Sequence, residues 1–167
     1  MGSTADNLKE AFAGESQANQ KYLAFAKKAQ EEGLTMVGKL FRAAAAAETV
    51  HAQNHLRVDR GIGDTAANLK AAMAGESEEF TSMYPGFVAE ARKAGQDKAV
   101  ETFDLAMQVE KIHHGLYSKA AVNVAAGKDL PYANMFVCRG CGNTVENVAP
   151  DKCPICGAPK SWFMWIE

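Results

Sequence analysis

Apolar residues recur at three- and four-residue steps along most of the chain, which is the period of helices with one buried face. The pattern predicts four helices, over residues 5–32, 35–59, 65–94 and 97–126. Glycine interrupts the pattern at each boundary, as expected where a helix ends. Pro85 lies inside the third segment and is expected to kink or disturb it. Because the connections are short, the helices are expected to form an antiparallel bundle.

The helical period stops near residue 127. Residues 128–134 indicate a linker, and residues 135–167 contain all four cysteines together with glycine, proline and aromatic residues. About 33 residues are too few for a stable hydrophobic core, so a bound metal is expected to hold this segment. The predicted fold is an all-α four-helix bundle over residues 1–127, followed by a small metal-bound domain of strands and loops.

An internal repeat relates the two halves of the predicted bundle. Residues 7–16 (NLKEAFAGES) and 68–77 (NLKAAMAGES) are identical at eight of ten positions, with an offset of 61. The motifs Glu48-x-x-His51 and Glu110-x-x-His113 recur with an offset of 62. Two related helical hairpins are therefore predicted, and a site between them would be nearly symmetric.

Each of the four apolar stripes has a glutamate in its middle. Carboxylates in a bundle core cost many kcal/mol when unpaired, and no Lys or Arg lies on the same stripes. Two Glu-x-x-His motifs plus one Glu from each other helix are the ligands of ferritin-like di-iron or di-manganese proteins. Glu79, three residues after Glu76, offers a seventh ligand where the repeat has Ala18. The predicted bundle ligands are Glu15, Glu48, His51, Glu76, Glu79, Glu110 and His113.

The cysteines form two Cys-x-x-Cys pairs with eleven residues between them, a strong tetrathiolate signal. Their spacing fits a structural zinc ribbon and a one-iron rubredoxin site almost equally. Two disulfides are less expected, because no secretory signal is visible. The predicted ligands are Cys138, Cys141, Cys153 and Cys156.

Composition excludes several classes of function. A net charge of −2 gives no reason to expect nucleic acid or an anionic membrane surface as a partner. No apolar run approaches the roughly 20 residues that span a bilayer. The first residues are neither basic nor apolar, so no signal peptide is predicted and a cytoplasmic location is expected. Gly61-x-Gly63-x-x-Ala66 follows a helix rather than a strand, which excludes a dinucleotide fingerprint.

Several segments together resemble the rubrerythrin family, over about residues 5–163. The resemblance implies a ferritin-like bundle with two iron ions, fused to a rubredoxin-like domain with one iron, or zinc if the site is mis-loaded. The matching segments are Gly14–Ala18 with Tyr22, Phe41–Ala43 with Glu48-x-x-His51, Glu76-x-x-Glu79 with Met83–Pro85, Glu110-x-x-His113, and Met135–Phe163.

The same resemblance implies a function: non-haem di-iron reduction of hydrogen peroxide to water in oxidative-stress defence. Electrons would come from the tetracysteine iron, supplied by an external NAD(P)H-linked reductase or a rubredoxin. The family is homodimeric, with electrons thought to pass from the tail of one subunit to the bundle of the other. It also implies that Glu79 and His51 are alternative ligands of one iron, and that Tyr22 and Tyr84 hydrogen-bond ligand oxygens.

Two other functions fit the same residues. One is a ferroxidase or dioxygen reductase on the same scaffold. The other is a non-enzymatic protein with a structural zinc ribbon, acting in iron handling or as a binding module. A preference for peroxide over dioxygen would distinguish a peroxidase from the ferroxidase or dioxygen reductase. The red colour of a ferric thiolate site would distinguish it from the protein with a structural zinc ribbon.

Overall fold

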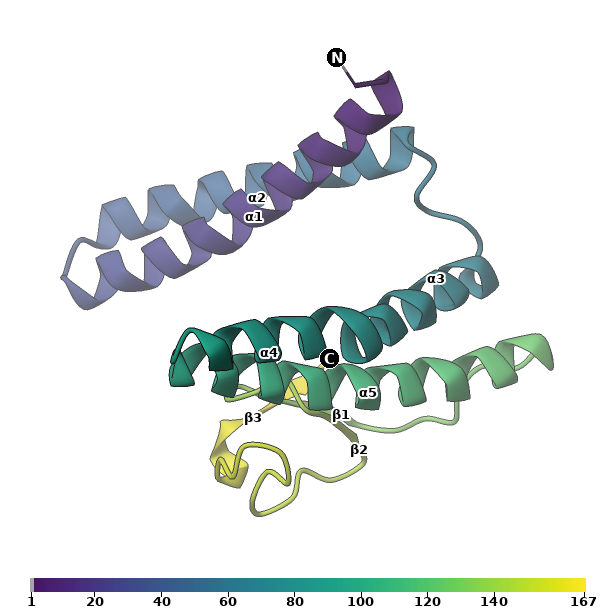
Figure 1. Cartoon of the computed structure of the whole chain (residues 1–167). Coiled ribbons are helices and arrows are strands. Elements are labelled where there is room, and N and C mark those ends of the chain that lie inside the picture. The colour runs from purple at the N-terminus through teal and green to yellow at the C-terminus, as the bar shows by residue number, and fades with distance from the viewer. Residues whose placement is uncertain (1) are drawn as a thin grey trace. The chain divides into compact units, whose positions relative to one another are not determined.

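Residues 2–167 are described in the computed structural model, and their contacts divide the chain after Gly63. The first unit is a helical hairpin. The second, from Asp64 to Glu167, combines another helical hairpin with a small three-stranded sheet (Figure 1). Four long helical segments followed by a cysteine-bearing sheet confirm the predicted fold class. Within the described residues, no helix is both long and apolar enough to cross a membrane.

The first hairpin consists of α1 (Thr4–Glu31) and α2 (Thr35–Val58). Its start is defined by a capping box, in which the Ser3 hydroxyl accepts from the Asp6 amide and the Asp6 carboxylate accepts from the Ser3 amide. These bonds from Ser3 lower the pKa of Asp6. Small residues allow the two helices to approach closely: a Cβ at Gly38 would lie 3.1 Å from the Ala26 carbonyl oxygen. The other buried residues of this interface are Ala29, Ala45 and Ala52.

The second hairpin has a discontinuity in its first helical segment. That segment consists of α3 (Thr65–Glu78), a π-helical turn η1 (Glu79–Met83) and α4 (Tyr84–Lys93), and it returns through α5 (Asp97–Ala125). The predicted disturbance thus lies immediately before Pro85. In this turn the Tyr84 amide donates to the Glu79 carbonyl, five residues back.

The π turn accounts for the change of repeat offset. The helix starts Thr4 and Thr65 differ by 61, whereas the starts Thr35 and Asp97 differ by 62. A π turn holds one residue more than an α turn, so η1 absorbs the extra residue. Beyond it, each hairpin has the same aromatic cluster at an offset of 62, with ring centroids 5.5–6.3 Å apart. The two clusters are Tyr22–Phe25–Phe41 and Tyr84–Phe87–Phe103.

The C-terminal segment, here called the tail, is a three-stranded antiparallel sheet in the order β2-β1-β3. Phe136 of the central strand pairs with Val145 on one side and Trp165 on the other. Both tryptophans of the tail are half exposed, so the sheet has little apolar core. The elements are β1 (Met135–Cys138), β2 (Thr144–Glu146), the short 3₁₀ helix η2 (Lys160–Trp162) and β3 (Phe163–Ile166).

Candidate metal centres

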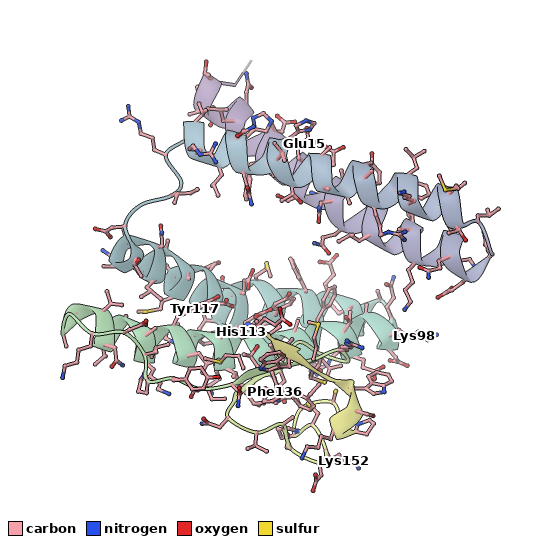
Figure 2. All side chains as sticks on the ribbon, turned by 180° about the vertical axis from the view of Figure 1, so that it is seen from behind. Glu15, Lys98, His113, Tyr117, Phe136 and Lys152 are labelled. Carbon is pink, nitrogen blue, oxygen red and sulfur yellow. The ribbon has the colours of Figure 1, made fainter. Side chains whose placement is uncertain are left out.

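The first hairpin brings together Glu15, Glu48 and His51, whose ligand atoms all lie within 4.8 Å of one another. Glu48 and His51 are one helical turn apart on α2, and His51 Nδ1 lies 2.9 Å from Glu48 Oε2. Glu15 comes from the middle of α1 (Figure 2). Two carboxylates and an imidazole nitrogen thus converge on one point.

The second hairpin repeats this arrangement with Glu76, Glu110 and His113. His113 Nδ1 lies 2.9 Å from Glu110 Oε2 and 3.9 Å from Glu76 Oε1. These side chains are only 15–26% exposed. Each of the two triads therefore offers oxygen and imidazole ligands, a donor set that suits iron or manganese.

The electrostatics of the second triad favour a cation. Burial, reinforced by the neighbouring Glu110, raises the pKa of Glu76 to about 7. Among the side chains that the structure describes, Glu76 Oε2 is the one buried nitrogen or oxygen atom without a hydrogen-bond partner. A buried carboxylate oxygen left unpaired is costly, and a bound metal ion would satisfy it. The residues present therefore fit the metal that the sequence predicts.

Glu79 and Tyr84 lie beside this second triad. Burial and then the charge of Glu110 raise the pKa of Glu79. Burial likewise raises the pKa of Tyr84, and the charges of Glu110, Glu79 and Glu76 act in the same direction. Glu79 lies at the start of the π turn, close enough to feel the triad's charge but outside the 4.8 Å cluster of Glu76, Glu110 and His113. Tyr22 lies in the aromatic cluster of the first hairpin.

The tail contacts the second triad directly. His113 Nε2, the ring nitrogen that faces away from Glu110, lies 2.9 Å from the Thr144 hydroxyl oxygen. Thr144 begins β2, and Figure 2 shows His113 where α5 meets the strands of the tail. A cavity of about 380 Å³ lies beside this contact, lined by both residues and by Leu116 and Leu130 among others.

The four cysteines of the tail form a separate candidate centre, with all four thiols free. Sγ–Sγ distances are 3.6 Å for Cys138–Cys156 and 3.7 Å for Cys141–Cys153. Metal–sulfur bonds of about 2.3 Å in a tetrahedron require sulfur atoms about 3.8 Å apart. Gly142 and Gly157 both have positive φ, at 85° and 75°, as the tight turn after each pair requires.

Hydrogen-bond donors surround the sulfur atoms. The Gly140 amide donates to Cys138 Sγ, and the amides of Ile155 and Cys156 donate to Cys153. Although burial opposes the change, these bonds lower the pKa of Cys153 to about 6, which favours the metal-binding thiolate. Burial raises the pKa of Cys141 and Cys156, so a cation is needed to hold all four as thiolates.

Asn143 is the buried polar residue of the tail, at 1% exposure. Its side-chain amide lies 3.6 Å from Cys153 Sγ, and its backbone amide donates to Cys141. Neither Asn143 nor Thr144 was among the residues that the sequence singled out. Their position two and three residues after Cys141 was the signal in the sequence that could have identified them. A chain that leaves a metal-binding cysteine must first pass beside the metal.

Paired helical hairpins with Glu-x-x-His triads and a tetracysteine tail define a class of non-haem metalloproteins with a carboxylate–histidine site and a separate thiolate site. Comparison with known families agrees. The rubrerythrin family model matches residues 6–121, and the model of the rubrerythrin rubredoxin-like domain matches residues 136–164. The chain belongs to the rubrerythrin family.

Individual relatives match over nearly their whole length. Rubrerythrin-2 of Clostridium acetobutylicum is 33% identical, over 96% of this chain and 95% of that protein. Nigerythrin of Nitratidesulfovibrio vulgaris is 37% identical, over 98% of this chain and 86% of its own. A solved structure of partially reduced nigerythrin matches with a TM-score of 0.58 at 34% identity, covering 99% of this chain and 88% of that one.

Proposed function

We propose that the chain reduces hydrogen peroxide to water, consuming two electrons and two protons for each peroxide. The two triads would jointly hold a pair of iron ions, and the four cysteines would hold a third. Membership of the rubrerythrin family supports a role as an oxidoreductase with these two kinds of site. The proposed setting is the cytoplasm, in defence against oxidative stress.

The observation that carries this proposal is the unpaired Glu76 Oε2, buried among carboxylates and beside an imidazole nitrogen. Glu76, Glu79 and Glu110 repel one another, and the nearest basic group, His113, lowers the pKa of Glu76 too little to offset burial. Bound cations would balance this charge. The repeat supports joint binding, because the first triad presents the same donors in the same Glu-x-x-His geometry.

Iron, when bound, supplies the one-electron changes that together make a two-electron reduction possible. The side chains supply binding and protons. With a pKa of about 7, the Glu76 carboxyl group can hold or release a proton near neutral pH. The Tyr84 hydroxyl keeps its proton throughout this range and can donate a hydrogen bond to a ligand oxygen. Glu79 is proposed to exchange with His51 at one metal position.

The tail is proposed to return electrons one at a time. Its thiolates lie on the unit that carries the second triad, and its donor would be an external NAD(P)H-linked reductase or a rubredoxin. A homodimer is the proposed assembly. The tail's donor-rich sulfur environment supports a redox ion, since amide bonds to sulfur stabilise the additional negative charge of the reduced form.

Iron reconstitution under anaerobic conditions tests the proposal. We expect about three iron atoms per chain by elemental analysis, matching the two predicted kinds of site. We also expect a red ferric thiolate absorption that bleaches on reduction. In stopped-flow mixing, the reduced protein should be reoxidised faster by peroxide than by dioxygen at equal concentration. A colourless zinc tail would contradict the electron-transfer role, and faster reaction with dioxygen would favour a ferroxidase or oxygen reductase.

A further inference from the structure

Two side-chain contacts attach the tail to α5 of its own chain, and Gly142 of the tail lies beside the same helix. An added Cβ at Gly142 would lie 3.6 Å from Val109, a buried residue of α5. One turn further along α5, His113 contacts the Thr144 hydroxyl. Beyond it, the Lys119 ammonium donates to both carboxylate oxygens of Glu146 at 2.7 Å. Strand β2 is thus held along one face of the helix that carries the second triad.

One arrangement of the hydrogen bonds of Thr144 leaves Nδ1 of His113 free for metal. The hydroxyl proton of Thr144 can be donated to the Gly142 carbonyl, 3.2 Å away, so its oxygen is left to accept from His113 Nε2. A proton on Nε2 leaves the lone pair of neutral imidazole on Nδ1, which faces Glu110 and Glu76. A histidine bound to metal through one nitrogen needs such an acceptor for the other.

We propose that Thr144 is a positioning residue that orients His113 for metal binding and couples the tail to the triad of its own chain. Only Gly142 and Asn143 separate Cys141 from Thr144. A short covalent path and one hydrogen bond therefore join a thiolate of the tail to the His113 ring. In each transfer the tail iron would change from ferrous to ferric, and one ferric ion of the bundle would become ferrous.

This same-chain route differs from the transfer between subunits that the family resemblance implies. The same-chain route follows from contacts within the unit Asp64–Glu167 alone. The redox part of the inference rests on the proposed function, whereas the positioning of His113 does not. The positioning of His113 can therefore be tested by measurements that need no turnover.

Thr144→Val is the decisive substitution, because it keeps the shape and strand preference of threonine and removes the hydroxyl. Valine is preferable to alanine, since water from the adjacent cavity could replace a hydroxyl beside the smaller side chain. Thr144→Ser restores the hydroxyl. Lys119→Met removes the neighbouring contact between tail and helix without touching His113.

Zinc titrated into the metal-free protein labelled with ¹⁵N-histidine gives the first measurement. In the wild type we expect His113 to carry its proton on Nε2, and this proton should exchange slowly with solvent. In Thr144→Val, exchange should be roughly 2- to 10-fold faster, the worth of one hydrogen bond, and the affinity of the bundle for ferrous iron about 10- to 100-fold weaker. Serine should restore both, and Lys119→Met should change neither.

The second measurement is the rate at which the reduced tail becomes ferric after peroxide is added. We expect Thr144→Val to slow it by about 10-fold or more at saturating iron, with recovery in Thr144→Ser. An unchanged rate would overturn the coupling. Equal losses in Thr144→Val and Lys119→Met would overturn the specific role of the hydroxyl and indicate that docking of the tail alone matters.

Mixed chains test the same-chain route. Chains with Cys153→Ser lack the tail site, and chains with His113→Ala lack the second triad. If electrons stay within a chain, mixed dimers of the two should show no peroxidase activity above that of either alone. Recovery of about a quarter of wild-type activity, the value expected from random pairing of dimers, would overturn the route.

Discussion

Asn143 offers the sharpest test of how the protein tunes its thiolate site. Its buried side-chain amide lies 3.6 Å from Cys153 Sγ, which also accepts from the amides of Ile155 and Cys156. Replacing it with leucine, which has the same side-chain branching, removes the side-chain donor. The backbone amide of residue 143, which donates to Cys141, is retained. Asn143→Leu should therefore lower the reduction potential of the tail iron.

The magnitude follows from the charge of the site. A hydrogen bond to a charged acceptor contributes about 1.5–3 kcal/mol. Four thiolates give the ferric site a net charge of about −1 and the ferrous site about −2. The bond therefore loses about half its energy on oxidation, some 0.8–1.5 kcal/mol. At about 59 mV per 1.4 kcal/mol for one electron, the expected shift is about 30–60 mV to lower potential.

The assay is a redox titration of the ferric thiolate absorption in iron-loaded protein, comparing Asn143→Leu with the wild type. Asn134→Leu is the matched control, since Asn134 is an exposed asparagine that precedes β1. It should leave the potential unchanged. A shift below about 10 mV in Asn143→Leu, or a shift to higher potential, would refute the reasoning, because the hydrogen bond to Cys153 would then not discriminate between oxidation states.

Four further predictions concern the helical part. Glu79→Ala should leave two metals bound but slow peroxide turnover, measured by stopped flow; unchanged turnover would show that Glu79 has no role in it. Glu76 has a folded-state pKa of about 7, above its ordinary 4.5, so the metal-free protein should lose stability as pH rises from 4.5 through 7, most clearly in thermal melts. Metal uptake at pH 7 should displace about half a proton from Glu76, and calorimetry in two buffers should find this contribution absent in Glu76→Gln. Val109→Ala, at a position 2% exposed, should lower the free energy of unfolding by about 2 kcal/mol in urea titrations; a loss near zero would mean that the helix–tail contact is loosely packed.

Local patterns predicted most of the fold. The helix boundaries differ from those expected by one residue at most, apart from the π turn, because capping residues and glycines act on their immediate neighbours. The Glu-x-x-His and Cys-x-x-Cys pairs were equally visible, since a single helical turn or loop brings their members together. The Thr144–His113 contact was not, because it joins residues 31 apart across two folding patterns. The location of the π turn was indicated by Pro85, which marked a disturbance there, but its π-helical geometry was not predicted.

The two histidines show how a repeated site acquires unequal halves. Both have Nδ1 2.9 Å from the glutamate one turn earlier. Nε2 of His113 contacts Thr144, and the His113 side chain is 26% exposed. The His51 side chain in the first hairpin is 54% exposed. A ligand that exchanges with a carboxylate must be free to move, and His51 is the less restrained of the two. Glu79, the carboxylate without a counterpart in the repeat, lies at the π turn that inserts the extra residue. One insertion in one hairpin and one hydroxyl from the tail thus make the two triads unequal, which supports the proposed exchange of Glu79 with His51 rather than with His113.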